Sequence, residues 1–234
     1  MATERGVVVF NTPGGNANAV KELVICGLLL SSRGIIQGHQ FAQTLSNQDA
    51  DELTHLVETN KKNFKGNELK GKTIGIIGLG AIGSLLAQSV VSMDMKVIGY
   101  DPNISIDAAW QLPKEVVKAD NLKDLLSNSD YISIHVPLVE ETKNLISNDV
   151  IKFIKPGAKL INLSRGSIVN NKDVLNALEN KKISTFVTDF PSPEMVKRSI
   201  EFSDVILLPH LGASTKEAEI NCAVMAAEQA TRFL

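Results

Sequence analysis

The chain has 234 residues, with 24 lysines and arginines against 26 aspartates and glutamates, and a formal net charge of −2. This balance gives no electrostatic attraction for nucleic acid or an anionic membrane surface, so a small molecule is the expected partner. The first residues lack the pattern of a signal peptide, and the longest apolar run, near residues 23–30, is too short to span a bilayer. We therefore expect a soluble, cytoplasmic protein with one large or two modest domains.

The first quarter of the chain predicts helices more clearly than strands. Residues 6–10 predict a short buried strand, and the next residues have the composition of a loop. Apolar residues recur at helical spacing over residues 18–32 with few polar positions between them, which predicts a buried helix. A more polar helix is expected over residues 49–60, followed by a polar connection over residues 64–70.

The most informative motif is Gly78-x-Gly80-x-x-Gly83, which stands between an apolar, β-branched run and a helix expected over residues 81–92. Gly78 allows a tight turn, Gly80 leaves room for a pyrophosphate to approach the backbone, and Gly83 lets the helix pack closely. The free N–H groups and positive dipole end of that helix favour phosphates. Asp101 ends the next strand and is placed to accept hydrogen bonds from a ribose diol, with no nearby cation for a 2′-phosphate. NAD is therefore favoured over NADP.

Strands then alternate with helices to the end of the chain, which predicts an α/β fold with a Rossmann-type, doubly wound parallel sheet. Strands are expected over residues 131–136, 159–163, 185–189 and 205–208, and helices over residues 122–126, 148–154, 172–179 and 215–233. The strands are nearly continuous apolar runs, as strands covered on both faces should be.

Polar residues stand at four of the expected strand ends, where ligands gather in such sheets: His135, Arg165, Asp189 and His210. Oxidation of a 2-hydroxy acid by hydride transfer needs a cation for the carboxylate and an acid/base for the hydroxyl proton. Arg165 can supply the cation through two parallel hydrogen bonds. His210 titrates in a useful range, and Glu194 is the natural carboxylate to support it.

The two cysteines, Cys26 and Cys222, lie in apolar runs with helical character. No cysteine–histidine spacing suggests a zinc site, so no metal is expected. We expect both to be buried, free thiols in a reducing compartment.

The ordered motifs resemble those of the NAD-dependent D-2-hydroxyacid dehydrogenases, and in particular their phosphoglycerate-type members. The likeness covers nearly the whole chain and rests on residues 10–23, 78–83, 135–137, 162–166, 188–191 and 208–215. It implies a catalytic trio of Arg165, Glu194 and His210, a contact between Asp189 and the nicotinamide amide, and a cofactor cleft lined by the His135 region and Thr142. The residues expected to bind the cofactor are Gly78, Gly80, Ala81, Ile82, Gly83, Asp101, His135, Val136, Pro137, Thr142, Asn162, Ser164, Arg165, Asp189, His210 and Gly212.

The chain departs from the family's pattern in two places. The family's glutamate usually stands in a Glu-Glu or Glu-Pro context, whereas Glu194 follows Pro193 and is the only acid in what reads as a loop. Family members also begin with a substrate-binding domain of which this chain lacks most. We therefore expect residues 1–17 to be the remnant of, and crossover from, that domain, residues 18–215 to form the NAD-binding domain, and residues 216–234 to form a helix returning towards the substrate-binding domain.

The resemblance implies oxidation of 3-phospho-D-glycerate by NAD, the first step towards serine. Another D-2-hydroxy acid such as glycerate or lactate, with glyoxylate as a related substrate, and a non-catalytic NAD(H)-binding scaffold like the family's corepressors remain open. Because the family's cofactor domains pair through helices that here span residues 18–66, a homodimer is expected.

Overall fold

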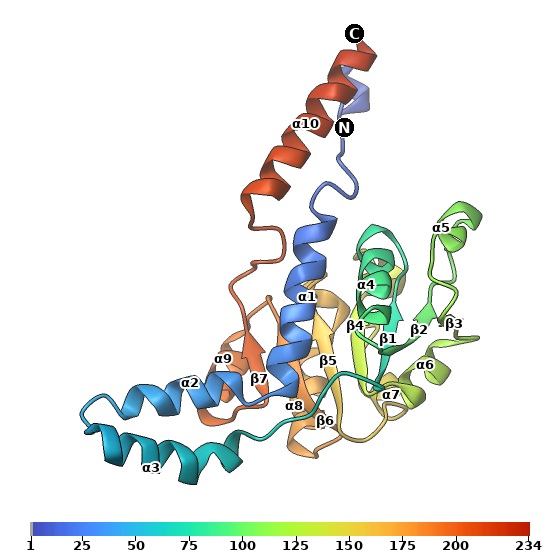
Figure 1. Ribbon diagram of the computed structural model, residues 1–234. Coiled ribbons are helices and arrows are strands. Elements are labelled where there is room, and N and C mark those ends of the chain that lie inside the picture. The colour runs from blue at the N-terminus through green and yellow to red at the C-terminus, as the bar shows by residue number, and fades with distance from the viewer. Residues whose placement is uncertain (1) are drawn as a thin grey trace.

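The computed structural model describes residues 2–234 and contains one sheet with helices on both faces (Figure 1). Seven strands lie in the order β3-β2-β1-β4-β5-β6-β7, and all neighbouring pairs are parallel. They are β1 (Thr73–Ile77), β2 (Lys96–Tyr100), β3 (Val116–Lys118), β4 (Tyr131–Ile134), β5 (Ala158–Asn162), β6 (Ile183–Thr188) and β7 (Val205–Leu207). The strand order reverses direction at β1, which is the arrangement of a doubly wound Rossmann fold and confirms the predicted class.

Ten α-helices and four 3₁₀ helices accompany the sheet in the described chain. The α-helices are α1 (Ala17–Ser32), α2 (Ile35–Thr44), α3 (Ala50–Asn60), α4 (Ala81–Val91), α5 (Ile106–Trp110), α6 (Leu122–Asn128), α7 (Asn148–Ile151), α8 (Asn171–Glu179), α9 (Pro193–Glu201) and α10 (Lys216–Phe233). The 3₁₀ helices are η1 (Thr3–Arg5), η2 (Lys61–Phe64), η3 (Glu140–Thr142) and η4 (Gly166–Ile168). The predicted helix over residues 18–32 corresponds to α1, and the one over residues 49–60 corresponds to α3 with Asp49 as its N-cap.

The core has one layer on each face of the sheet. On one face, α1 and α4 pack on the central strands through side chains such as Val24, Leu28 and Leu86. On the other face, α6, α8 and α9 contribute Leu125, Val174 and other apolar side chains. Because strand side chains alternate between the two layers, almost every central strand position is buried, which explains their continuous apolar runs.

The two ends of the described chain lie side by side and away from the sheet (Figure 1). The Phe10 and Phe233 rings pack edge to face at 5.9 Å, and Gln229 donates a hydrogen bond to the Asn11 carbonyl. The prediction of a buried strand over residues 6–10 was wrong: the segment has no regular structure, and Val7, Val8 and Val9 are exposed. A strand needs a neighbour for its backbone hydrogen bonds, and no described segment lies beside it as a partner strand.

The prediction of two buried thiols was also wrong in part. Both cysteines are free, but Cys26 is exposed on α1 and Cys222 on α10 is half-buried. Cys26 lies on the exposed face of α1. The helix is apolar on most sides, so its composition alone did not show that this cysteine would be exposed.

Across residues 2–234, no helix has both the length and the apolar character that a membrane span requires.

Candidate cofactor and catalytic site

The glycine motif forms the turn between β1 and α4, and each glycine has a distinct steric reason. Gly78 has a φ of 94°, in the left-handed region, and a Cβ there would lie 2.8 Å from the carbonyl carbon and oxygen of His135. A Cβ on Gly83 would lie 2.0 Å from the Gly78 carbonyl oxygen. By contrast, a Cβ on Gly80 would meet nothing within 4 Å. Gly78 and Gly83 are therefore required by the fold, whereas the space beside Gly80 is open to a ligand.

The first turn of α4 provides the donors for that ligand. Gly80 is the N-cap residue and has no side chain to cap the helix, so the N–H groups of Ala81, Ile82 and Gly83 face the loop without a capping side chain. Asp101 lies beside the same loop: its carboxylate accepts hydrogen bonds from the Leu79 N–H at 2.8 Å and the Asn103 N–H at 3.0 Å. These two bonds hold the acid next to the turn, where a dinucleotide's adenosine half would bind.

The loop after β4 carries His135, Val136 and Pro137. Burial lowers the pKa of His135 to about 4, so its imidazole is neutral at pH 7, and Nε2 lies 2.8 Å from the Ser133 hydroxyl. Thr142 braces the loop, because its hydroxyl donates to the Pro137 carbonyl at 2.6 Å. Ser133 was not predicted; its position two residues before His135, on the same face of the strand, is the signal that could have identified it.

Two side chains, Asn162 and Ser164, fix the loop between β5 and Arg165 by hydrogen bonds. The buried Asn162 amide accepts from the Ser164 N–H at 3.2 Å and donates to the Arg165 carbonyl at 3.0 Å. The Ser164 hydroxyl donates to the Val136 carbonyl at 2.6 Å, which ties this loop to the loop after β4. The Arg165 guanidinium is exposed and donates to the Ser164 carbonyl, leaving donors free for an anionic ligand.

Asp189 and His210 come together at the ends of β6 and β7. The His210 N–H donates to the Asp189 carbonyl, and the Gly212 N–H donates to Asp189 Oδ2 at 3.1 Å. His210 has a φ of 53°, which is uncommon for a residue with a side chain and marks local strain of the kind found at functional sites. Its exposed ring packs on Phe190 with 5.0 Å between the ring centroids.

The charges of these residues act on one another. Burial raises the pKa of Asp189, while the Gly212 N–H and the positive charges of His210 and Arg165 oppose that rise. The structure therefore brings Arg165, Asp189 and His210 within electrostatic range at the carboxyl edge of the sheet.

Glu194 does not join this group. It lies in the first turn of α9, not in a loop as expected, because Ser192 caps that helix and Pro193 occupies its first turn. Its exposed carboxylate accepts from the Ser192 hydroxyl at 2.9 Å, and its own backbone N–H and that hydroxyl lower its pKa. In the described residues no hydrogen bond joins Glu194 to His210, and Glu194 lines a hollow between α8 and α9.

The residues present fit a dinucleotide. Asp189 Oδ1 is buried without a hydrogen-bond partner within the described structure, and an unsatisfied buried acceptor suits an amide N–H donor such as that of nicotinamide. The open space beside Gly80 suits a pyrophosphate at the start of α4. Within residues 2–234 no group of three or more histidine, cysteine, aspartate or glutamate side chains could hold a metal ion.

Comparison with known proteins agrees with this geometry. The family model described as the NAD binding domain of D-isomer specific 2-hydroxyacid dehydrogenases matches residues 27–212. D-3-phosphoglycerate dehydrogenase of Synechocystis sp. is 38% identical over 230 residues, which are 97% of this chain and 39% of that protein. The enzyme of the same name from Bacillus subtilis is 34% identical over 234 residues, which are 99% of this chain and 42% of that protein.

Solved structures show the same fold. Apo D-mandelate dehydrogenase of Rhodotorula graminis superposes with a TM-score of 0.81 at 26% identity, covering 99% of this chain and 66% of that one. D-lactate dehydrogenase of Aquifex aeolicus, complexed with NAD and lactic acid, gives a TM-score of 0.78 at 25% identity, covering 99% of this chain and 71% of that one.

The chain thus belongs to the D-isomer-specific 2-hydroxyacid dehydrogenase family, of which it carries the NAD-binding domain. NAD is its cofactor. The chain spans about two-fifths of the length of the D-3-phosphoglycerate dehydrogenases that it matches.

Proposed function

We propose that the protein oxidises the C2 hydroxyl of 3-phospho-D-glycerate, a reaction that begins serine synthesis. The observation that carries the proposal is the convergence of Arg165, Asp189 and His210 at the same edge of the sheet as the glycine loop, because oxidation of a hydroxy acid needs a cation and a proton acceptor near the cofactor. The names of the relatives with 34–38% identity support this substrate.

Each residue has a separate role in the proposal. The free donors of Arg165 bind the substrate carboxylate and orient the oxygen that becomes a ketone. His210 accepts the hydroxyl proton on its imidazole, while Asp189 holds the His210 loop and binds the cofactor's carboxamide. Bound NAD supplies the hydride acceptor.

Glu194 is the least supported member of the trio. We propose that it supports the His210 imidazolium, which requires the Glu194 carboxylate to leave Ser192 and move towards His210. If it does not move, Glu194→Gln will leave the pH profile of turnover unchanged, and Asp189 will be the carboxylate that acts on His210.

The test is NADH formation with 3-phospho-D-glycerate in the protein that contains this chain. His210→Ala should abolish turnover but still bind NAD, because the glycine loop and Asp101 are unchanged. Lys114→Ala, at an exposed position away from the candidate site and from α1–α3, is the control and should keep the wild-type rate. Wild-type turnover of His210→Ala would remove His210 from the mechanism, and NAD binding without turnover of any substrate would favour a cofactor-sensing scaffold.

The substrate is tested by competition among 3-phospho-D-glycerate, D-glycerate and D-lactate, with glyoxylate in the reverse direction. Preference for an acid without a phosphate would replace the proposed substrate by another member of the same class. The solved D-lactate and D-mandelate dehydrogenases show that this fold serves such acids.

We further propose that residues 1–17 and α10 belong with a substrate-binding domain; of these, Met1 lies outside the described residues. The exposed apolar side chains of residues 7–10, together with Ile220 and Val224 on α10, support this division because such surface is usually covered.

We also propose a homodimer that pairs through α1, α2 and α3. Exposed apolar side chains on the two outer helices, Ile35, Leu53 and Val57, support it, and a monomer mass by light scattering at micromolar concentration would contradict it. A cytoplasmic location is proposed because both cysteines are free, the usual state in a reducing compartment.

A further inference from the structure

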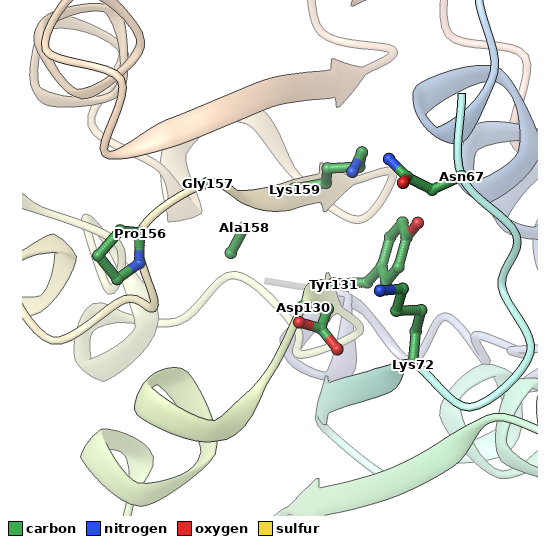
Figure 2. Close-up of a pocket in the computed structure, with 8 residues that line it drawn as sticks. All are labelled: Asn67, Lys72, Asp130, Tyr131, Pro156, Gly157, Ala158 and Lys159. Atoms are coloured by element: carbon green, nitrogen blue, oxygen red, sulfur yellow. The ribbon is translucent and has the colours of Figure 1, made fainter. Parts of the chain in front are cut away.

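A second polar cavity lies at the amino-terminal edge of the sheet, opposite the edge that carries the cofactor loop. It has a volume of about 170 Å³, several times what one water molecule needs. Figure 2 shows its lining: Asn67 before β1, Lys72 at the start of β1, Asp130 and Tyr131 at the start of β4, and residues 156–159 leading into β5. These residues come from three separate parts of the sequence, and neither the proposed reaction nor the cofactor uses them.

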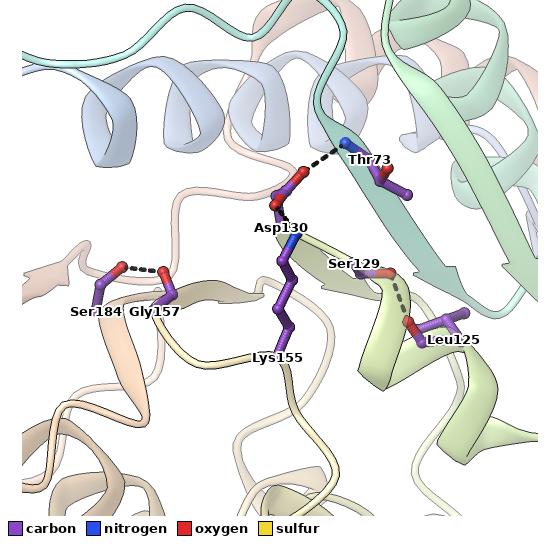
Figure 3. Close-up of polar contacts among 7 residues, drawn as sticks. All are labelled: Thr73, Leu125, Ser129, Asp130, Lys155, Gly157 and Ser184. Carbon is purple, nitrogen blue, oxygen red and sulfur yellow. Dashed lines mark hydrogen bonds and ion pairs between the residues drawn. The ribbon is translucent and has the colours of Figure 1, made fainter.

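The one acid in the cavity already has partners. Asp130 accepts from the Lys155 ammonium at 2.7 Å through one carboxylate oxygen and from the Thr73 N–H at 2.9 Å through the other (Figure 3). Both bonds favour its ionised form, and they lower its pKa although burial opposes this. The negative charge of Asp130 is therefore matched by Lys155, outside the cavity lining.

The two cations in the cavity have no such partner. In the described structure neither Lys72 nor Lys159 makes an ion pair, and the Asn67 side chain makes no hydrogen bond. The Lys159 ammonium lies 4.9 Å from the centre of the Tyr131 ring, and Lys159 is half-buried. Burial lowers the pKa of Lys159, and the charge of Asp130 partly opposes this decrease. The charge of Lys72 lowers the pKa further, which shows that the two lysines are close enough to repel each other.

The backbone around the cavity offers few donors of its own. The N–H groups of Lys72, Lys159 and Gly157 donate to the carbonyls of Leu69, Asp130 and Lys182. Binding capacity therefore resides in side chains, because Lys72, Lys159 and Asn67 all line the cavity.

The surroundings add further positive charge. A neighbouring hollow shares Asn67 and is lined by Arg33, Lys61, Lys62 and Lys65 with a single acid, Glu68. The whole protein has a net charge of −2, so this concentration of cations is local. Such a cluster raises the local concentration of anions.

We propose that this cavity, between Lys72, Lys159 and Asn67, is a binding site for a small dianion that carries a phosphate group. Lysine ammonium groups bind phosphate as point charges, and two unpaired ones match a charge of −2. Asn67 belongs to the segment between α3 and β1, so the bound phosphate also links that segment to β4 and β5. The site is separate from the pyrophosphate site at Gly80, which lies at the opposite ends of the strands.

The test is calorimetric titration of inorganic phosphate into protein saturated with NAD, at constant ionic strength, so that the glycine loop cannot take up phosphate. We expect saturable binding of one phosphate per chain. Lys72→Met and Lys159→Met should each weaken it by about tenfold or more, the effect of losing one hydrogen bond to a charged group. Lys72→Arg should retain binding because the charge is kept, and Lys114→Met, an exposed lysine outside the cavity, should bind as wild type does.

Two further arms separate the possible outcomes. A phosphate monoester without a carboxylate, methyl phosphate, and a monoanion, chloride, are titrated in the same way: a dianion site binds free phosphate or the monoester and excludes chloride. Urea unfolding of each variant shows whether a loss of binding comes from unfolding, and Lys72→Met should unfold as wild type does because Lys72 is exposed. Absence of saturable phosphate binding, or equal affinity in wild type and Lys72→Met, would overturn the proposal.

Discussion

Alanine substitutions at two glycines of the same loop should separate folding from cofactor binding. A Cβ on Gly83 would lie 2.0 Å from the Gly78 carbonyl oxygen, far inside contact distance, and a backbone atom cannot rotate away. The start of α4 must therefore shift, and the stability loss should reach the upper part of the overpacking range, about 3 kcal/mol. For a chain of this size, that corresponds to a fall in Tm of roughly 6–12 °C.

Gly80→Ala should have the opposite profile. A Cβ there meets no protein atom within 4 Å, and the backbone dihedral angles of Gly80, −68° and −161°, are open to any residue. The stability cost should stay at or below about 1 kcal/mol, the cost of a poorer N-cap residue. The methyl group occupies the space where a pyrophosphate meets the helix N–H groups, so NAD affinity should fall by about tenfold or more.

The assays are thermal unfolding and calorimetric NAD titration of both variants beside wild type. The reasoning is refuted if Gly80→Ala binds NAD as tightly as wild type. It is equally refuted if Gly83→Ala melts within about 2 °C of wild type, since the steric contact would then carry less than about 1 kcal/mol.

Three other substitutions test charges at both edges of the sheet. Asp101→Ala should weaken NAD binding and narrow the preference for NAD over NADP, measured by titration of both cofactors. Asp130→Asn should lower the free energy of unfolding at pH 7 by about 1–3 kcal/mol, because the Lys155 ammonium and a backbone N–H lose a charged acceptor. The pKa of Asp130 is lowered in the folded state, so this difference is present above the ordinary aspartate range and should shrink as the pH falls below about 4. The His135 pKa of about 4 lies below its unfolded value, so wild type should lose roughly 3 kcal/mol between pH 6.5 and 4, and His135→Gln should lose less.

Urea unfolding as a function of pH measures the effects of Asp130→Asn and His135→Gln, and each predicted pH dependence can be contradicted independently of the other. The unfolded His135 binds a proton between pH 6.5 and 4 while the folded one does not, so stability must rise with pH across that window. A pH dependence identical in wild type and His135→Gln would show that the half-buried imidazole takes up its proton as readily as an exposed one. If the difference in free energy of unfolding between wild type and Asp130→Asn persists at pH 3, the Asp130 contacts do not depend on the carboxylate charge.

Long periodic segments of the chain were predictable, and short or uncovered ones were not. The sheet and its large helices follow from apolar runs and helical spacing, because burial on both faces dictates the residue types. Helices α2 and α5 and strand β3 were missed since each is short or exposed, which leaves no strong periodicity to detect. Helix α9 was missed for another reason: Ser192 and Pro193 indicate a helix start, but the two prolines at 191 and 193 were interpreted as a loop.

Features of the site that depend on the local backbone conformation could be predicted from the sequence. Gly78 and Gly83 have the conformational and steric reasons that the motif predicted. Contacts between distant residues were harder: the sequence put Glu194 beside His210, yet its side chain points to Ser192 and the α8–α9 hollow. The amino-edge cavity could not be predicted, because Asn67, Lys72 and Lys159 meet only once the strand order is known.

Asp189 at the carboxyl edge of the sheet has a buried carboxylate oxygen that a bound ligand can satisfy. Its carboxylate is 1% exposed, with one oxygen bonded to Gly212 and the other unpartnered within the described structure. An unsatisfied buried acceptor costs about 1–3 kcal/mol. The strained φ of His210 adds to this cost, and the loop that Asp189 holds is the loop that carries His210. An amide donor from the cofactor would satisfy the free oxygen and offset that cost, so cofactor binding and the placement of His210 should be thermodynamically linked.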